Sequence, residues 1–473
     1  MKLQSIDMNR TKDIAKIAIP HRAAHMLSPD ERAAAGKVLR DKIPRKQHGE
    51  WKEVAGRPNP IDLLRKSDAG RMKNLVAIRY SRMLQSPFAF YRGAAGVMAS
   101  DLARIPATGL IVQACGDCHL MNFGGFATPE RNVIFDINDF DETSPASWEW
   151  DVKRLVASIV LAGRANGLSD SQGRDCAISC ARRYREHMRE FSKMDPLGVW
   201  YAKTSAADFV KSLPRGLRKN VKKRIEKAAN RDGAEFDFPK LAGSVGGQIR
   251  ITDQPPLIFH PETTPEADEA LGDLFHAYRR SLADDRRILL DRYRLVDVAI
   301  KVVGVGSVGR RCWIALMMSE KNDPLFLQFK EAVESVLEPY AGKSPYNHHG
   351  LRVVMGQRLM QPASDIFLGW ATAPNGRQFY VRQLHDAKIK PLVESFNAEM
   401  LDVYSMACGW VLARAHAKAS QISATISGYL GASSDEFDRA MGKFALAYAD
   451  QAERDHAALK AAVRKGKIVV CRE

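Results

Sequence analysis

The hydrophobic positions in the first half of the chain recur mainly at helical spacing. Apolar residues return every three or four positions, which is typical of helices with one face in a core. On this pattern helices are predicted over Ala69–Leu84, Ala89–Arg104, the segment that follows Ser147, and Ser169–Ser192. Two short apolar runs between them, Leu110–Val112 and Val133–Phe135, are rich in β-forming residues and predict strands.

The second half of the chain changes to strand character. After Arg250 the chain is extended and interrupted by prolines, and a helix is then predicted from about Pro265 to Leu289. The segment DVAIKVVGVGSVGRRCWIALMM follows, and it predicts a strand, a glycine-rich turn and a second strand. Later elements are a strand over Pro324–Ala332, a helix over His349–Gln361, a hairpin over 365–384 and a helix over Leu401–Ser420. Helices followed by an antiparallel sheet predict the α+β class.

One stretch of the helical half combines side chains that a single kind of chemistry needs. Asp117 precedes Asn122 by five positions, and the strand Val133–Phe135 runs into a group of acids. The acids are Asp136, Asp139 and Asp141. In phosphoryl transfer from a nucleotide, one carboxylate orients the acceptor hydroxyl, while an amide and a second carboxylate hold magnesium. A single Asp or Asn is more often a turn or cap residue, but the spacing of this set favours the catalytic interpretation.

A glycine-rich segment marks the sheet half. Gly304, Gly306 and Gly309 form G-x-G-x-x-G around Ser307. A dinucleotide fold needs a helix at the third glycine and an acid about 20 residues later. Here β-forming residues follow instead, starting at Cys312, which favours a glycine loop between antiparallel strands that covers phosphates, as in kinases. A glycine hairpin without a ligand is the alternative.

Lys330 lies near the end of the strand that follows the glycine hairpin. In a kinase-like lobe this strand carries the lysine that pairs with the α- and β-phosphates. An ordinary surface lysine is the competing interpretation, and the order of elements favours the phosphate role. Its acidic partner stays open among nearby glutamates. These are Glu331, Glu334 and Glu338.

The order of the elements in the second half is that of the small lobe and hinge of a kinase. It consists of a glycine hairpin, a lysine strand, a helix, a second hairpin and a long helix. In a kinase the catalytic loop follows these elements. Here the Asp117 segment stands far earlier in the chain, so the fold is predicted to be circularly permuted.

Several segments together resemble the bacterial domain of unknown function 2252 (DUF2252) family, over nearly the whole chain. They are Ser86–Gly93, Gly116–Asn122, Asn138–Glu142 and the pair GVGSVG and LQFKEA. The resemblance implies membership of the protein-kinase-like superfamily, beside the aminoglycoside and choline phosphotransferases. The G-D-x-H-x-x-N form is also similar to the loop of phosphatidylinositol kinases.

The resemblance also implies roles for individual residues. Asp117 is the expected catalytic base, Asn122 a magnesium ligand, and Asp139, which opens Asp-Phe-Asp where kinases have Asp-Phe-Gly, the second magnesium ligand. His119 is expected to orient the loop by a hydrogen bond. Asp139 lies 17 positions after Asn122, a little longer than the common interval, and Asp136 at 14 positions fits better. Asp139 is favoured for its Asp-Phe context, and Asp136 is the alternative ligand.

Two features of the sequence differ from the kinase pattern, and they bear on the phosphate contacts and on the class of acceptor. Arg311 stands two positions after the third glycine, where kinases usually have an aliphatic residue, so the phosphate contacts of the loop are expected to differ. No activation-loop or peptide-docking pattern is evident. This favours a small-molecule acceptor over a protein substrate.

Composition and length fit a two-lobed kinase-like fold. A chain of 473 residues exceeds what one hydrophobic core usually supports, and 45% hydrophobic residues provide for a substantial core. The predicted parts are a basic N-terminal arm packed over the body (1–70), a mainly helical catalytic lobe (71–213), a basic linker (214–245), a smaller nucleotide-binding lobe with the glycine-rich hairpin (246–395), and C-terminal helices packing on the catalytic lobe (396–473).

The net charge of +16 predicts a surface that attracts anions, phosphate-rich small molecules among them. The basic segment 215–231 lacks the interleaved aromatic residues of a single-strand binding surface, so nucleic acid is a less favoured partner, though not excluded. No apolar run approaches the roughly 20 residues that span a bilayer. The N-terminal residues do not form a signal peptide pattern, so a cytoplasmic location without a transmembrane segment is expected.

Three smaller observations leave alternatives open. Seven scattered cysteines favour reduced thiols over a disulfide framework. Cys115 and Cys118 form a C-x-x-C, for which redox or zinc chemistry is the alternative to packing. Asp151, early in the helix after Ser147, either accepts hydrogen bonds from backbone amides of the loop holding Asp117 or places favourable charge at a helix N-terminus.

Together these features predict an ATP- and magnesium-dependent phosphotransferase that acts on a hydroxyl group of an unidentified acceptor. One alternative is nucleotidyl transfer, in which the same parts attach AMP to a protein. The other is a catalytically silent nucleotide-binding regulator, which the presence of Asp117, Asn122 and Lys330 disfavours.

Overall fold

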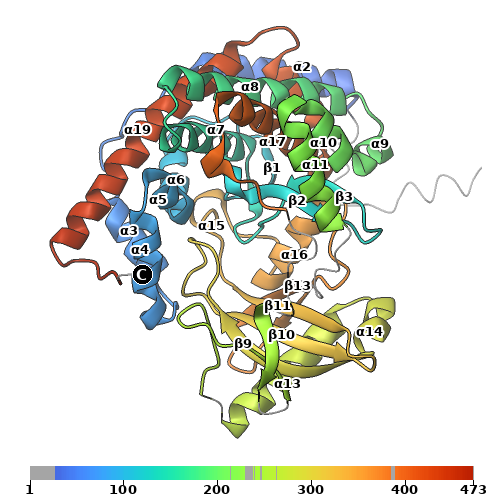
Figure 1. The fold of residues 1–473 in the computed structure, drawn as a ribbon. Coiled ribbons are helices and arrows are strands. Elements are labelled where there is room, and N and C mark those ends of the chain that lie inside the picture. Colours follow the sequence, from blue (N-terminus) through green and yellow to red (C-terminus); the bar gives the residue numbers. More distant parts are fainter. Residues whose placement is uncertain are drawn as a thin grey trace, which may run out of the picture.

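A larger helical lobe and a smaller sheet lobe make up the chain in this computed structural model (Figure 1). The structure describes residues 27–213, 215–229, 238, 240–245, 248–262, 264–384 and 389–471. The predicted α+β class is confirmed. Residues 1–26 of the predicted arm, and several residues of the predicted basic linker, lie outside the described residues.

Long helices form the centre of the helical lobe. They are α7 (Trp148–Ala165), α8 (Asp170–Phe191), α17 (Ala398–Ala419) and α19 (Glu436–Arg464). The N-terminal 16 residues of α7 are all buried, because α8, α17, α19 and strand β1 (Ile111–Ala114) pack around it. Its Trp148 and Ile159 are fully buried in the largest hydrophobic core. The end of the chain therefore completes a core that begins in its first half.

Short N-terminal elements lie along these C-terminal helices. The elements are α2 (Pro29–Lys42), η2 (Arg45–Gly49) and α3 (Pro60–Ser67). Proline starts both α2 and α3, since its fixed φ suits the first position of a helix. Helix α2 packs against α18 (Ser423–Leu430), and η2 packs against α19.

The helix predicted over Ala89–Arg104 is two helices, α5 (Pro87–Gly93) and α6 (Ala95–Leu102). The chain leaves helical geometry at Ala94, whose φ is −117° and ψ 34°. At Gly93, α5 packs directly on α4 (Lys73–Leu84), where an added Cβ would lie 2.8 Å from the Met83 side chain. The helix predicted from Pro265 is likewise divided, into α13 (Pro265–Ser281) and α14 (Asp284–Leu290).

The sheet lobe is built on one antiparallel sheet with strand order β12-β13-β11-β10-β9-β8. The strands are β8 (Ile258–Phe259), β9 (Tyr293–Lys301), β10 (Cys312–Ser319), β11 (Pro324–Ala332), β12 (Gly369–Thr372) and β13 (Gln378–Gln383). The predicted glycine hairpin, the strand carrying Lys330 and the hairpin over 365–384 are confirmed as antiparallel pairs.

Both faces of this sheet are covered. Helices α13 and α14 pack on one face, and β6 (Ala242–Val245) with β7 (Gln248–Ile251) packs on the other. Strand β10 is consequently almost continuously buried instead of alternating between apolar and polar residues. Helix α16 (His349–Met360) lies between the sheet and the helical lobe, and its Val353 and Val354 belong to the helical core.

Small strands frame the loop that contains Asp117. Strand β1 pairs with β4 (Ser144–Ser147), and β2 (Phe123–Ala127) pairs with β3 (Val133–Ile137), which pairs with β5 (Thr204–Ser205). The remaining elements are η3 (Leu120–Asn122), α9 (Pro196–Tyr201), α10 (Ala206–Ser212), α11 (Arg215–Ala229), α15 (Glu338–Ala341) and η4 (Val393–Ser395). Among the described residues, none of the helices has the length and apolar character that a bilayer crossing demands.

Candidate functional site

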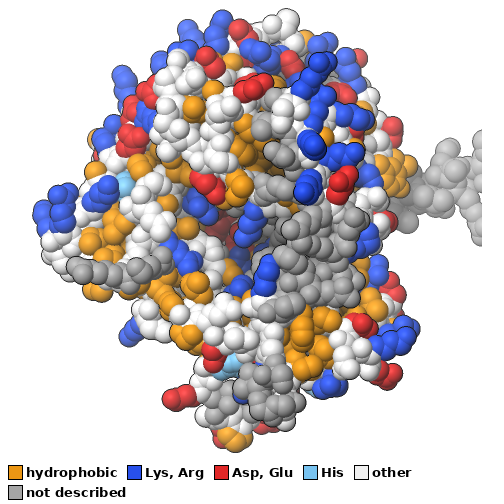
Figure 2. Space-filling view, viewed as in Figure 1, with side chains coloured by type: hydrophobic (Ala, Val, Ile, Leu, Met, Phe, Trp, Pro, Cys, Tyr) orange, Lys and Arg blue, Asp and Glu red, His pale blue; other side chains and the backbone are white. Residues whose placement is uncertain are grey.

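A cleft of about 690 Å³ lies where the two lobes meet. Figure 2 shows it as a central hollow with Lys and Arg side chains at its edges. Most of the predicted site residues line it, although they come from segments far apart in the chain. These are Asp117, His119, Asn122, Asp139, Gly304, Gly306, Ser307 and Lys330. Asp136 and Gly309 are not part of the lining.

Side chains of helix α7 hold the loop that carries Asp117 through hydrogen bonds. Asp151 accepts hydrogen bonds from the backbone amides of Cys115 (2.7 Å) and Gly116 (3.0 Å), which confirms the first of its two predicted roles. Ser158 accepts a further bond from the amide of Leu120 at 3.1 Å. Gly116 has φ +85°, and a Cβ there would lie 2.2 Å from the carbonyl oxygen of Glu142, so only glycine fits.

Substituting Asp151 tests this support. The change Asp151→Asn replaces one accepting oxygen by an NH₂ group that faces an N–H donor, so we expect a loss of about 2 kcal/mol in the free energy of unfolding. Urea denaturation would measure it. The exposed Asp175→Asn on α8 serves as the control, and equal stability of the two variants would contradict the role given to Asp151.

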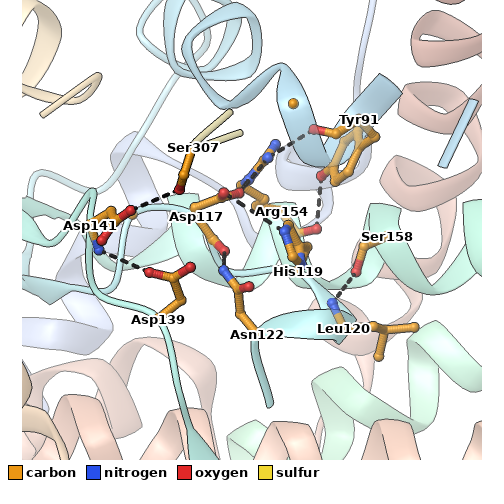
Figure 3. Close-up of polar contacts among 12 residues, drawn as sticks. Tyr91, Asp117, His119, Leu120, Asn122, Asp139, Asp141, Arg154, Ser158 and Ser307 are labelled. Carbon is orange, nitrogen blue, oxygen red and sulfur yellow. Dashed lines mark hydrogen bonds and ion pairs between the residues drawn. The ribbon is translucent and has the colours of Figure 1, made fainter. Parts of the chain in front are cut away.

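Asp117 is the carboxylate at the centre of the loop. Its Oδ1 accepts bonds from Arg154 Nε (2.7 Å) and Nη2 (2.5 Å), whereas Oδ2 lies 3.7 Å from His119 Nε2 (Figure 3). Burial raises the pKa of Asp117, and the charge of Arg154 opposes this shift. Arg154 thus orients one oxygen and leaves the other toward the cleft.

His119 does not play its predicted part. Its ring is buried, its Nδ1 has no hydrogen-bond partner, and its Nε2 is too far from Asp117 for a hydrogen bond. Burial and the charges of Arg92 and Arg154 hold the pKa of the imidazole well below its usual value, so the ring is neutral. The loop is instead ordered by its backbone, in which the amide of Asn122 donates to the carbonyl of His119 at 2.8 Å.

Asn122 and Asp139 are the expected oxygen ligands, and Figure 3 shows them beside Asp117. Asn122 Nδ2 donates to the carbonyl of Asp117 at 2.6 Å, which leaves its Oδ1 available. Asp139 lies 3.7 Å from Lys330 Nζ. Burial and the neighbouring carboxylate of Asp141 raise the pKa of Asp139. Two partly buried carboxylates close together form a site that a cation would stabilise.

Asp136, the alternative ligand, does not line the cleft with Asn122 and Asp139. It lies in β3, is fully buried and forms an internal ion pair with Arg414 of α17 at 2.5 Å. It also accepts a bond from the amide of Ile137. Burial raises its pKa to about 6 in spite of Arg414. Its carboxylate joins β3 to α17, and the shorter interval from Asn122 was therefore misleading.

Asp141 is the acidic partner of Lys330, which sequence reasoning left open. Its carboxylate contacts Lys330 Nζ and accepts bonds from Tyr380 (2.7 Å) and Ser307 (3.1 Å). Burial opposes its ionisation, but Lys330 and the hydrogen bond from Tyr380 lower the pKa of Asp141 to about 2. Asp139 and Asp141 in turn raise the pKa of Lys330 above its usual value, against the effect of burial.

Two of the three glutamates named as possible partners of Lys330, Glu331 and Glu338, form other ion pairs. Glu331 pairs with Arg377 (2.7 Å) and with Arg311 (3.5 Å), which accounts for the arginine found after the glycine segment. Glu338 pairs with Arg352 of α16. Arg352 also donates to the carbonyls of Asp141, Thr143 and Val333. It therefore holds the Asp-Phe-Asp segment in place.

The glycine segment is docked on the N-terminal helices. Val305 and Val308 are buried against residues of α3, α4 and α5. The amide of Met72 donates to the carbonyl of Gly309 at 2.8 Å, and Arg82 donates to that of Gly304 at 2.7 Å. Gly304 and Gly309 have φ of +68° and +86°, a conformation that favours glycine. The tip of the segment is thus fixed over the cleft.

Cys115 and Cys118 lie within the core below the loop. With Asp151 they form a buried group whose candidate ligand atoms lie within 4.8 Å of one another. Burial raises the pKa of both thiols, for Cys118 to about 12, so they are protonated. Both oxygens of Asp151 already accept backbone hydrogen bonds. These contacts favour a packing role over redox or zinc chemistry.

Comparisons with known proteins identify the family. Residues 71–462 match the family described as "Uncharacterized protein conserved in bacteria (DUF2252)", and the chain belongs to it. No curated protein and no solved structure matches the chain.

Proposed function

We propose that this member of the DUF2252 family is an ATP- and magnesium-dependent phosphotransferase with a circularly permuted, protein-kinase-like fold. Its acceptor would be a hydroxyl group of a small molecule. The observation that carries the proposal is the convergence of Asp117, Asn122 and Asp139 with Lys330 and Ser307 on one cleft, from segments far apart in the chain. A glycine-rich strand pair, a lysine and a catalytic carboxylate are the parts that phosphoryl transfer needs.

The order of elements supports the permutation. The sheet lobe runs from the glycine hairpin through Lys330 and α16 to the hairpin β12–β13, and the chain then enters the helical lobe at α17. The Asp117 loop comes from the N-terminal half, and it packs on α17 through Tyr404, which donates to the carbonyls of Leu120 and Phe123. The helical lobe is thus assembled from both ends of the chain.

The residues present fit magnesium. Asn122 Oδ1 and the Asp139 carboxylate are hard oxygen donors on neighbouring parts of the cleft, and Mg²⁺ is bound in such sites by one or two carboxylates together with substrate phosphates. The ion would neutralise phosphate charge. Lys330 has three donors, so it can keep its contact with Asp141 and still donate to a phosphate oxygen. Asp117 would accept the proton of the acceptor hydroxyl.

Thermal stability with and without ligand tests nucleotide binding. We expect millimolar ATP to raise the melting temperature in a magnesium-dependent way, because a ligand at about 100 times its Kd stabilises the native state by about 2.7 kcal/mol. Lys330→Met should abolish most of this rise, and Asp139→Asn should abolish its dependence on magnesium.

Each variant is compared with its own unliganded state, because removing Lys330 leaves Asp139 and Asp141 without their buried counter-charge. Lys343→Met, at an exposed lysine of the same lobe, is the matched control and should respond like the wild type. The absence of any nucleotide effect on the wild type would refute the proposal. With binding established, label transfer from γ- but not α-labelled ATP would distinguish phosphate transfer from AMP transfer.

A further inference from the structure

The cations that line the cleft differ in whether they already have partners. Lys330 is paired with Asp141, and Arg377 with Glu331. Arg382 donates to Gln328 Oε1 and to the carbonyl of Asn138. Arg377 and Arg382, two of the arginines that line the cleft, therefore already have partners within the protein.

Arg92 stands apart from them. It lines the cleft, yet it forms no hydrogen bond and no ion pair with the described residues, and its Nε is buried without a partner. Its guanidinium carbon lies 5.9 Å from the centroid of the Phe88 ring. Buried donors usually have a hydrogen-bond partner, and a bound ion can supply one.

The position of Arg92 is next to the predicted reaction centre. It lies in the last turn of helix α5, and a Cβ on Gly306 would lie 3.4 Å from its carbonyl oxygen, so its backbone lies next to the glycine segment. Its side chain acts electrostatically on Asp117 and His119, and the charges of Asp117 and Glu394 act on it in return. Arg92 therefore lies next to the glycine segment and within electrostatic range of the carboxylate that would receive the acceptor.

The chemistry of the side chain indicates its ligand. A guanidinium group presents donors in a planar fork that matches the oxygens of phosphate or carboxylate, and it remains charged when buried. A neutral acceptor such as a simple sugar would leave this charge unpaired.

We propose that Arg92 binds an anionic group, a phosphate or a carboxylate, of the acceptor, so that the substrate is a small hydroxyl compound already carrying negative charge. This inference rests on the phosphotransferase proposal and adds the class of its acceptor. Arg92 would fix the distance between the anionic group and the hydroxyl presented to Asp117. It would thereby select among acceptors.

The variant Arg92→Gln tests the inference, with the exposed Arg104→Gln outside the cleft as the matched control. Because Arg92 forms no ion pair, the variant should keep the melting temperature of the unliganded wild type. The protein is first loaded with magnesium and a non-hydrolysable ATP analogue. We expect wild type, Arg92→Gln and Arg104→Gln to bind this analogue with equal Kd.

Inorganic phosphate is then titrated into the loaded protein, with malonate in a parallel series to distinguish a phosphate site from a carboxylate site. We expect saturable binding of either probe to the wild type and to Arg104→Gln. In Arg92→Gln the affinity should fall at least about tenfold, because one bidentate contact is lost. Equal binding by all three proteins, or no binding to the wild type, overturns the inference. Loss of analogue binding in Arg92→Gln also overturns it, because Arg92 would then serve the nucleotide.

If the phosphotransferase proposal is wrong, the wild type should fail to bind the ATP analogue, which is a different outcome from loss of anion binding. If the wild type does not bind the analogue, the phosphate titration is made on the free protein. Binding that depends on Arg92 then supports an anion site without nucleotide chemistry, and binding that does not depend on it overturns the inference.

Discussion

Asp117→Asn should lower the rate of phosphoryl transfer by about 10²–10⁴-fold, the usual contribution of a positioned general base, while ATP binding stays within about twofold of the wild type. The reason lies in the two carboxylate oxygens. Oδ1 is held by Arg154, and Oδ2 is the oxygen left to receive a proton. Asparagine can keep the first contact through its oxygen, but it places an NH₂ group where the acceptor hydroxyl would donate.

The measurement is transfer of label from γ-labelled ATP to small molecules of a bacterial extract, followed by separation of the products. Asp41→Asn, at an exposed aspartate of α2, controls for the loss of one negative charge. Retention of transfer by Asp117→Asn at about the wild-type rate would show that this carboxylate is not the base. Binding of ATP by the same variant shows that the fold and the nucleotide site survive the substitution.

Local features of the site could be predicted from the sequence. The interval from Asp117 to Asn122 spans a single loop, and the hydrogen bond between the Asn122 amide group and the Asp117 carbonyl closes that loop. The glycine hairpin was recognisable because strand-forming residues follow Gly309, and these pair with β9 in the structure. Features of this kind depend on residues close in sequence.

Features that depend on distant partners could not be predicted. Asp136 and Asp139 look equivalent in sequence, but Asp136 faces Arg414, which lies 278 residues further along the chain. Asp139 follows the end of β3 and turns toward the cleft. Asp141 becomes the partner of Lys330 only because the sheet lobe closes over the loop, and Arg154 reaches Asp117 from a helix 37 residues away. A spacing rule carries no information about such contacts.

The division of the predicted helix 89–104 has the same origin. Its apolar residues do recur at helical spacing, yet α5 ends at Gly93, where α4 packs closely against it, and Ala94 has non-helical φ and ψ. Arg92 lies in the last turn of α5, just before this break, and in the cleft lining. Tertiary packing thus overrides local periodicity at a position that matters for the proposed acceptor site.

Arg57→Ala should destabilise the protein by about 3–5 kcal/mol, the usual cost of removing one member of a buried ionic group. Arg57 joins the N-terminal segment to two helices at once. It bonds Asp101 of α6 at 2.8 Å and Asp455 of α19 at 2.6 Å, and the three side chains are at most 6% exposed. Without it, two carboxylates remain buried next to each other with no counter-charge. Urea denaturation followed by tryptophan fluorescence would measure the change.

Two comparisons decide whether buried charge is the cause. Arg174→Ala breaks an exposed pair with Asp175 and should cost about 0–1 kcal/mol, so an equally small effect at Arg57 would contradict the prediction. The triple variant Arg57→Met, Asp101→Asn, Asp455→Asn removes all three charges together. Because a buried ionic group can often be replaced by neutral residues at little cost, it should recover most of the stability lost in Arg57→Ala. If the triple variant is less stable than Arg57→Ala, the carboxylates stabilise the fold through other contacts, such as the bond that Asp101 accepts from Tyr448.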